Sequence, residues 1–107
     1  MATGQSHILI IDDESSVRSG CSRSLTENGY QVTSRSTGQS GLQDGLKGAF
    51  DLVLLDMKLP DLDGMSILLR LHESRPDLPV IVMTGYSTVD NAVQAMKAGA
   101  FDYLAKP

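Results

Sequence analysis

Reactive side chains stand at the ends of four short apolar segments of this sequence. They are three carboxylates, a hydroxyl and an ammonium, contributed by Asp12, Asp13, Asp56, Thr84 and Lys106. If the apolar segments are buried parallel strands, their carboxyl ends lie along one edge of a sheet, where open α/β sheets hold their ligands. We therefore expect the five side chains to meet in one pocket.

The three carboxylates would repel one another in such a pocket, so without a cation at least one of them should bind its proton more tightly than usual. A hard cation resolves this conflict. Mg²⁺ takes oxygen ligands in an octahedron and keeps some of its waters, which suits one or two carboxylates together with a phosphoryl oxygen. Asp12, Asp13 and Asp56 are therefore candidate ligands of Mg²⁺, with Mn²⁺ as a substitute.

Apolar segments rich in β-branched residues predict five strands, over residues 7–11, 30–34, 51–55, 80–83 and 101–104. Apolar residues at helical spacing predict four helices between them. The second helix carries Gly38, Gly41, Gly45 and Gly48, so we expect it to be marginal. Strands and helices that alternate at this spacing imply right-handed crossovers and a parallel sheet covered on both faces.

One domain accounts for the 107 residues, with residues 1–6 expected as a disordered tail and the domain over residues 7–107. The net charge of −4 comes without a Lys/Arg cluster, which argues against direct binding of nucleic acid. No apolar stretch approaches the ~20 residues that cross a bilayer, and no signal peptide opens the chain, so we expect a cytoplasmic protein without a membrane contact. A fifth helix should cover the last strand, so the chain is expected to stop roughly 10 to 15 residues short of the domain end.

These features, in this order, resemble the receiver domain of bacterial response regulators. The resemblance rests on an acidic pair after the first strand, Asp after the third, Thr-Gly after the fourth, an aromatic residue three positions before Lys, and Lys-Pro after the fifth. The segments DLVLLDMKLPDLDGM and VIVMTGYSTVDNAVQAMKAGAFDYLAKP are most similar to receivers of the nitrogen-regulation class, which precede an ATPase module and a DNA-binding module. The resemblance implies a flavodoxin-like doubly wound sheet with strand order 2-1-3-4-5, truncated here before its fifth helix.

The resemblance also implies a chemistry for the pocket. Asp56 would accept a phosphoryl group from the phosphohistidine of a sensor histidine kinase, in a Mg²⁺-dependent reaction. Asp13 and Asp56 would bind the metal directly, Asp12 directly or through water, and the Lys58 backbone carbonyl would complete the protein ligands. Such a protein catalyses only its own phosphorylation and dephosphorylation, so it is not an enzyme that turns over a substrate.

A switch follows from the same resemblance. Lys106 would balance the charge of Asp56 and then of the phosphoryl group, while Thr84 and Tyr103 would move and report phosphorylation to the surface of the fourth helix and fifth strand. That surface would carry contacts to a second copy of the chain, to an output domain that follows this segment, or to a partner protein in transcription regulation. Gly85 would leave the approach to Asp56 open.

The residues Lys58 and Tyr86 stand at positions that tune the lifetime of the phosphorylated state, by resemblance. Our hypothesis is that their bulk shields the phosphoryl group from attacking water.

Other functions remain to be weighed against this one. A flavin mononucleotide site would need a Ser/Thr/Gly-rich phosphate loop after the first strand, where Asp12-Asp13-Glu14 would repel a phosphate. A phosphatase with an Asp nucleophile usually carries a second acid two residues later, where this chain has Lys58. A pseudo-receiver that serves as a protein-binding scaffold would not need the intact set of reactive residues.

Overall fold

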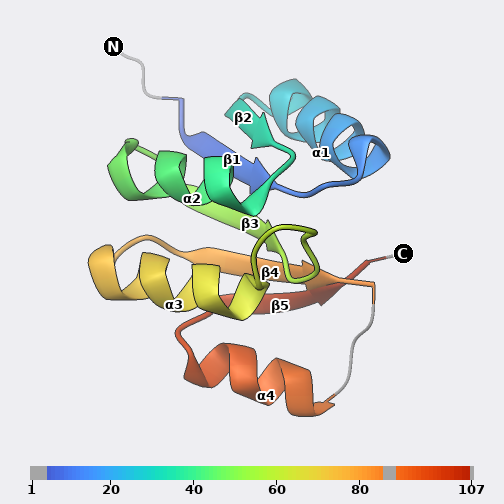
Figure 1. Ribbon diagram of the computed structural model, residues 1–107. Helices are drawn as coiled ribbons and strands as arrows, with labels where there is room; N and C mark the ends of the chain where they lie inside the picture. Colours follow the sequence, from blue (N-terminus) through green and yellow to red (C-terminus); the bar gives the residue numbers. More distant parts are fainter. Residues whose placement is uncertain (1–4, 86–88, 107) are drawn as a thin grey trace.

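The sheet has five parallel strands within the part of the chain that the structure describes. The computed structural model describes residues 5–85 and 89–106. The strands are β1 (His7–Ile11), β2 (Gln31–Arg35), β3 (Leu52–Asp56), β4 (Val80–Thr84) and β5 (Asp102–Ala105), in the spatial order β2-β1-β3-β4-β5 (Figure 1). The predicted fold class and strand order are confirmed.

Four helices connect the strands within the described ranges. They are α1 (Ser15–Glu27), α2 (Gly38–Lys47), α3 (Gly64–Ser74) and α4 (Val89–Lys97). Buried residues of α2, α3 and α4 belong to one core cluster, so these three helices cover the same face of the sheet, whereas α1 lies against β1 and β2 on the other face. None of the helices described is both long enough and apolar enough to cross a bilayer.

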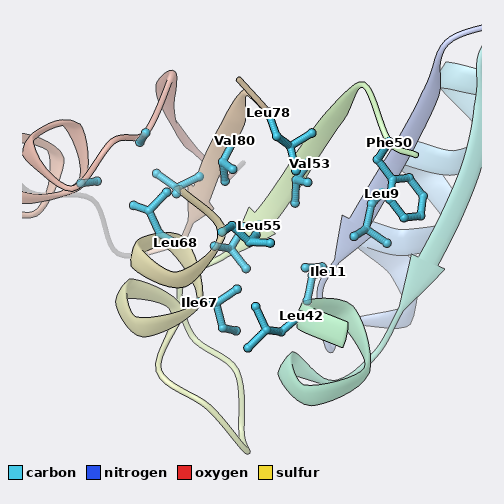
Figure 2. Packing of buried hydrophobic residues seen from close by; sticks show 14 residues of the cluster. Leu9, Ile11, Leu42, Phe50, Val53, Leu55, Ile67, Leu68, Leu78 and Val80 are labelled. Atoms are coloured by element: carbon cyan, nitrogen blue, oxygen red, sulfur yellow. The ribbon is translucent and has the colours of Figure 1, made fainter. Parts of the chain in front are cut away.

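The strand β1 is buried on both faces, as expected for a central strand of a parallel sheet. Successive side chains of a strand point to opposite faces. Leu9 and Ile11 join the core cluster beneath α2 and α3 (Figure 2). By this alternation Ile8 and Ile10, which are also buried, belong to the face that carries α1. The central position of β1 matters for the site, because the residues that follow it emerge in the middle of the sheet edge.

The face of the sheet that carries α1 has an apolar groove beside β4 and β5. Val17 and Cys21 of α1 line one side of this 740 Å³ groove, and Met83 and Leu104 line the other. Leu104 keeps 46% of its surface exposed. Since α1 is the helix that the structure describes on this face, the β5 side of the groove has no helix over it in residues 5–85 and 89–106.

The glycines of α2 are required by the close packing of this helix against its neighbours. A Cβ atom at Gly41 would lie 2.6 Å from Ile11 Cγ1, and one at Gly45 would lie 2.8 Å from Leu71 Cδ2. Side chains at these two positions would push α2 away from β1 and α3. The helix is present over Gly38–Lys47, and its close packing favours it against the low helix propensity of glycine, while its marginal stability stays a prediction.

Candidate functional site

The register of the sheet brings the ends of β1 and β3 level. Ile11 pairs with Leu55, so the residues that follow, Asp12 and Asp56, emerge side by side. Thr84 ends the next strand, β4, at the same edge. The structure therefore places strand-end side chains from three neighbouring strands together at the carboxyl edge of the sheet.

Three carboxylates converge at this edge. Asp12, Asp13 and Asp56 each offer an oxygen, and the three oxygens all lie within 4.8 Å of one another. Asp12 is 0% exposed and Asp56 is 3% exposed, whereas Asp13 is open to solvent. The carboxylates of Asp12 and Asp56 are thus shielded from water, whereas the neighbouring carboxylate of Asp13 remains solvated.

The ammonium of Lys106 lies among these carboxylates. Lys106 Nζ is 2.9 Å from Asp12 Oδ2, 3.2 Å from Asp56 Oδ2 and 2.8 Å from Glu14 Oε1. Burial alone would lower the pKa of Lys106, but its contacts with Glu14 and Asp12 and the charge of Asp56 outweigh burial and raise that pKa above its ordinary value. Lys106 therefore stays charged wherever the carboxylates are ionised.

The pKa of the Asp56 carboxyl is raised above its ordinary value. Burial is the largest cause, and the charge of Asp12 adds to it, while the hydrogen bond from Lys58 N–H and the charge of Lys106 act in the opposite direction. The expectation that one member of the acidic group would bind its proton more tightly is fulfilled at Asp56. Burial and the charge of Asp12 thus outweigh the opposing effects of the Lys58 amide and of Lys106 on the pKa of Asp56.

The donor set suits a hard divalent cation. All three carboxylates present oxygen ligands, and the buried Asp12 Oδ2 meets Lys106 at 2.9 Å as an ion pair without a directed hydrogen bond. An anionic oxygen that is buried and incompletely hydrogen-bonded costs free energy, which a bound cation would recover. Burial and the charge of Asp12 together raise the pKa of Asp56, so the ionised form of Asp56 is also less favourable here than in water.

The loop between β3 and α3 forms one wall of the site. Lys58 N donates to Asp56 Oδ1 at 3.1 Å, and the backbones of Lys58 and Asp63 form a bridge. At the base of the loop, Gly64 N donates to the Met57 carbonyl at 3.3 Å. This closed loop holds the Asp56 carboxylate in one orientation and brings the Lys58 backbone to the rim.

We expect Gly64→Ala to destabilise the fold. A Cβ at Gly64 would lie 2.5 Å from Met57 Cα and 2.7 Å from its carbonyl oxygen, which are backbone atoms that cannot swing away. Overpacking of this kind costs about 1–3 kcal/mol, which chemical denaturation would measure. Gly20→Ala is the matched control, because nothing lies within 4 Å of its Cβ in the middle of α1. That variant should instead gain up to about 1 kcal/mol; a Gly64→Ala protein of unchanged stability would contradict the packing argument.

The predicted switch residues share a second cavity. A space of 410 Å³ is lined by Met57, Lys58, Thr84 and Tyr103 together with residues of α4. Thr84 is buried at the end of β4. The Tyr103 hydroxyl is also buried, and it has no hydrogen-bond partner within residues 5–85 and 89–106. The two residues thus face a common space between the acidic group and α4.

The access side of the site is an open cavity of 490 Å³. Its lining includes Asp13, Asp56, Lys58, Gly85 and Lys106. Gly85 is exposed, and a Cβ there would meet no described atom within 4 Å. Tyr86, which we predicted at this entrance, lies outside the described residues.

Two residues at the site escaped the sequence-based prediction of its members. Glu14 binds Lys106 Nζ at 2.8 Å, and Arg18 Nη1 donates to the Asp12 backbone carbonyl at 2.8 Å. The position of Glu14, directly after the acidic pair, was a signal that could have pointed to it. Arg18 stands one helical turn further, where it fixes the turn between β1 and α1 that presents Asp12.

The comparison with known families decides the class of protein. A model of the response regulator receiver domain matches residues 8–107. The chain belongs to this family. The receiver sequence is 39% identical over 107 residues to the transcriptional regulatory protein ZraR of Klebsiella oxytoca, which covers 100% of this chain and 24% of that protein. It is 41% identical over 98 residues to the DNA-binding transcriptional regulator NtrC of Klebsiella pneumoniae, covering 92% of this chain and 21% of that protein.

These relatives confirm the predicted likeness to receivers of the nitrogen-regulation class, and this receiver spans about a quarter of their length. Solved structures agree with the fold. A CheY-like receiver domain protein of Methanospirillum hungatei JF-1 has a TM-score of 0.92 and 36% identity, over 97% of this chain and 83% of that one. A response regulator of Burkholderia pseudomallei, solved with a phosphorylated aspartic acid, calcium ion and citrate, has a TM-score of 0.89 and 33% identity, over 96% and 61% of the two chains.

Proposed function

We propose that this receiver domain is a phosphorylation-controlled switch in which Asp56 accepts a phosphoryl group from a sensor histidine kinase. The observation that carries the proposal is the convergence of three carboxylates on one ammonium at an open cavity, with Lys106 Nζ 2.9 Å from Asp12 and 3.2 Å from Asp56. Phosphoryl transfer needs a nucleophile, a charge-balancing cation and positioning donors, and these side chains can supply all three.

The metal would be held by Asp12, Asp13, Asp56 and the Lys58 backbone carbonyl. When bound, Mg²⁺, or Mn²⁺ in its place, supplies neutralisation of the phosphoryl oxygens as they approach the acidic group. The phosphorylated aspartate and calcium ion of the Burkholderia pseudomallei protein support this assignment by similarity.

The transfer itself is a displacement at phosphorus. One carboxylate oxygen of Asp56 forms the new P–O bond as the P–N bond of the kinase's phosphohistidine breaks. The electron pair of that bond stays on the imidazole, which takes up a proton from solvent. The hydrogen bond from Lys58 N to Asp56 Oδ1 at 3.1 Å orients the carboxylate. Lys106 pairs with the Asp56 carboxylate before the transfer and would pair with the phosphoryl oxygens after it.

The test is Mg²⁺-dependent uptake of a single phosphoryl group. The intact protein is incubated with acetyl phosphate, with Mg²⁺ or with a chelator, and its mass is measured. We expect one phosphoryl group that is stable in acid, labile in base and dependent on Mg²⁺, together with Mg²⁺-dependent binding of beryllofluoride. A protein that takes up neither would instead be a pseudo-receiver scaffold. Continuous phosphate release from an added small phosphoester would favour a phosphatase.

Phosphorylation would be relayed through Thr84 and Tyr103 toward α4 and β5. The cavity that both residues line, and the buried Tyr103 hydroxyl without a described partner, support two alternative positions for these side chains. Moving a population from 1:99 to 99:1 would require the phosphorylated site to favour one state by about 5.5 kcal/mol. Exposed apolar residues of α4, Val89, Val93 and Met96, offer a contact surface for a second copy or an output domain.

We expect Tyr103→Ala to uncouple phosphorylation from dimerisation. In the full-length protein, beryllofluoride should strengthen dimerisation of the parent but shift the variant's dimer dissociation constant at least ~10-fold less, a loss of about 1.4 kcal/mol of coupling. Analytical ultracentrifugation would measure this. Tyr30→Ala is the control, since Tyr30 is an exposed tyrosine on another surface. An unchanged response of the Tyr103 variant would remove its switch role.

We expect Lys58→Ala combined with Tyr86→Ala to shorten the lifetime of the phosphorylated state. Lys58 lines the entrance cavity, where its side chain would hinder water on its way to the phosphoryl group, and Tyr86 directly follows Gly85, which lines the same cavity. Loss of the mass adduct after removal of the phosphodonor should be several-fold faster. Lys47→Ala, a change of the same type at the far end of α2, should leave the rate unchanged. An unaltered rate in the double variant would refute the shielding hypothesis.

The wider setting of the domain is part of the same proposal. We infer that the protein acts in the cytoplasm. A sensor histidine kinase would be the phosphodonor, and an output domain or partner protein in transcription regulation would receive the signal. This segment itself would not bind nucleic acid or membrane. A helix formed by chain beyond Pro107 is the occupant that we propose for the apolar groove beside Leu104 and Val17.

A further inference from the structure

The carboxylate of Asp61 joins the β3–α3 loop to the start of α2. Gly38 N donates to Asp61 Oδ1 at 2.8 Å, and Gln39 N donates to Asp61 Oδ2 at 2.9 Å. The first amides of a helix have no partner within the helix, so these two bonds satisfy donors that would otherwise rely on water. The hydrogen bonds from Gln39 and Gly38 lower the pKa of Asp61, which keeps the carboxylate ionised.

The same junction is tightly packed. A Cβ at Gly38 would lie 2.9 Å from Ile67 Cδ1, 3.0 Å from Leu62 Cβ and 3.1 Å from Asp61 Oδ1. The absence of a side chain at Gly38 therefore lets the helix start rest directly on the loop. Two independent features, the paired hydrogen bonds and this close approach, fasten the loop to α2.

The opposite end of this loop is a wall of the acidic site. Lys58 binds Asp56 Oδ1 through its amide and pairs with Asp63 through its backbone, while Gly64 closes the base on Met57. Asp61 lies between Lys58 and Asp63 in the sequence, at the part of the loop that faces α2. The hydrogen bonds of Asp61 therefore restrain a short closed loop that also contains the Lys58 carbonyl.

We propose that Asp61 is a positioning residue for the metal site. By fixing the loop to α2, its carboxylate holds the Lys58 backbone where the cation needs it, so that less loop freedom is lost when the cation binds. The inference rests on the proposed function, because that function supplies the metal. Coupling between two sites is reciprocal, so a ligand at the acidic site should in turn stabilise the first turn of α2.

The test compares Asp61→Ala with Asp61→Asn in the intact protein. Supporting contacts behind metal ligands are commonly worth 10-fold or more in affinity, so Asp61→Ala should weaken Mg²⁺ binding about 10-fold in a calorimetric titration. Asp61→Asn keeps one acceptor oxygen and should fall between Ala and the parent. Both variants remove the same charge, so a purely electrostatic influence would give them equal affinities and would overturn the proposal.

Two further variants separate positioning from other causes. Asp63→Asn makes the same charge change in the same loop, where the side chain forms no cap hydrogen bond, and should leave Mg²⁺ affinity within about twofold of the parent. Arg75 holds the far end of α2 by donating to the Gly45 and Gly48 carbonyls. Arg75→Ala should lower the thermal midpoint without changing Mg²⁺ affinity; an equal loss of affinity in that variant would mean that general loosening of α2 is responsible.

Amide exchange gives a readout that a merely structural role would not move. In the parent, Mg²⁺ with beryllofluoride should slow hydrogen exchange at Gly38 and Gln39 several-fold, and in Asp61→Ala the same addition should leave both amides unaffected. If the parent binds Mg²⁺ and beryllofluoride but Asp61→Ala binds Mg²⁺ equally well, the positioning role alone is refuted. If the parent binds neither, the proposed function fails and this inference with it.

Discussion

We expect the Asp56→Asn protein to take up no phosphoryl group from acetyl phosphate, because a carboxamide cannot replace the carboxylate as nucleophile. We expect its phosphorylation to fall at least ~100-fold below the parent, to the detection limit of intact-mass measurement. The same variant should be more stable than the parent in the absence of Mg²⁺. The substitution removes the buried Asp56 carboxylate beside Asp12. The raised pKa of this carboxyl means that its ionised form is less favourable in the folded protein than in water.

The stability difference between Asp56→Asn and the parent should depend on pH. Since the pKa of Asp56 is higher in the folded than in the unfolded protein, the folded state binds the proton more readily. Asp56 therefore costs stability at neutral pH, and that cost disappears as pH falls through the raised pKa. Thermal unfolding without Mg²⁺ should show the parent approaching Asp56→Asn as the pH is lowered.

An exposed site provides the control for charge removal. Asp77→Asn makes the same change in the α3–β4 connection, away from the acidic group, and should neither block phosphorylation nor raise stability. A phosphoryl group still found on the Asp56→Asn protein would place the nucleophile elsewhere. A variant less stable than the parent at neutral pH would contradict the electrostatic account of the site.

The second large effect is expected for Lys106→Met. This change keeps the length of the side chain but removes the ammonium that lies 2.9 Å from Asp12 and 3.2 Å from Asp56. Loss of a preorganised charge or donor in a reacting site typically slows the reaction ~10²-fold or more, and we expect phosphorylation by acetyl phosphate to slow by this factor. Time courses of mass labelling would measure it.

Lys106→Met should also destabilise the fold at neutral pH. The carboxylates of Asp12 and Asp56 would remain buried without their partner, and breaking a buried ion pair costs on the order of 3 kcal/mol. The pKa of Lys106 is raised in the folded state, so its stabilising contribution in the parent is fully present at neutral pH and is lost only as pH rises through that raised pKa. The difference between parent and variant should shrink in acid, where the carboxylates are protonated.

Lys47→Met is the matched control, because Lys47 is an exposed lysine at the end of α2. It should change neither the labelling rate nor the pH profile. A Lys106→Met protein with parental phosphorylation would show that the ammonium does not balance charge in the transfer.

The positions of the strands could be predicted from the sequence where the pattern of apolar side chains alone determines them. The segments of β1, β3 and β4 are apolar and largely buried, so their composition identified them. At β5 the prediction began at residue 101, whereas the strand runs Asp102–Ala105 and Phe101 is 68% exposed. The sequence could not distinguish an apolar residue in a strand from one in the preceding turn.

Site membership was predictable for residues that directly follow the strands, because a parallel sheet brings all its carboxyl ends to one edge. It was not predictable for residues whose partners are distant in sequence. Glu14 binds Lys106 across 92 residues, and Asp61 binds Gly38 across 23. In the sequence, Asp61 is an ordinary turn residue after Pro60, and nothing local indicates that its carboxylate holds another helix.

The acidic site combines the first strand of the domain with the last. Asp12 follows β1, whereas Lys106 follows β5, so the site is complete only after β1, β3, β4 and β5 have paired. During synthesis the acidic residues leave the ribosome long before Lys106 does. A nascent or partly unfolded chain therefore lacks the finished site. Under the proposed function, competence to accept a phosphoryl group would coincide with completion of folding, and binding of beryllofluoride would serve as a measure of correctly folded protein.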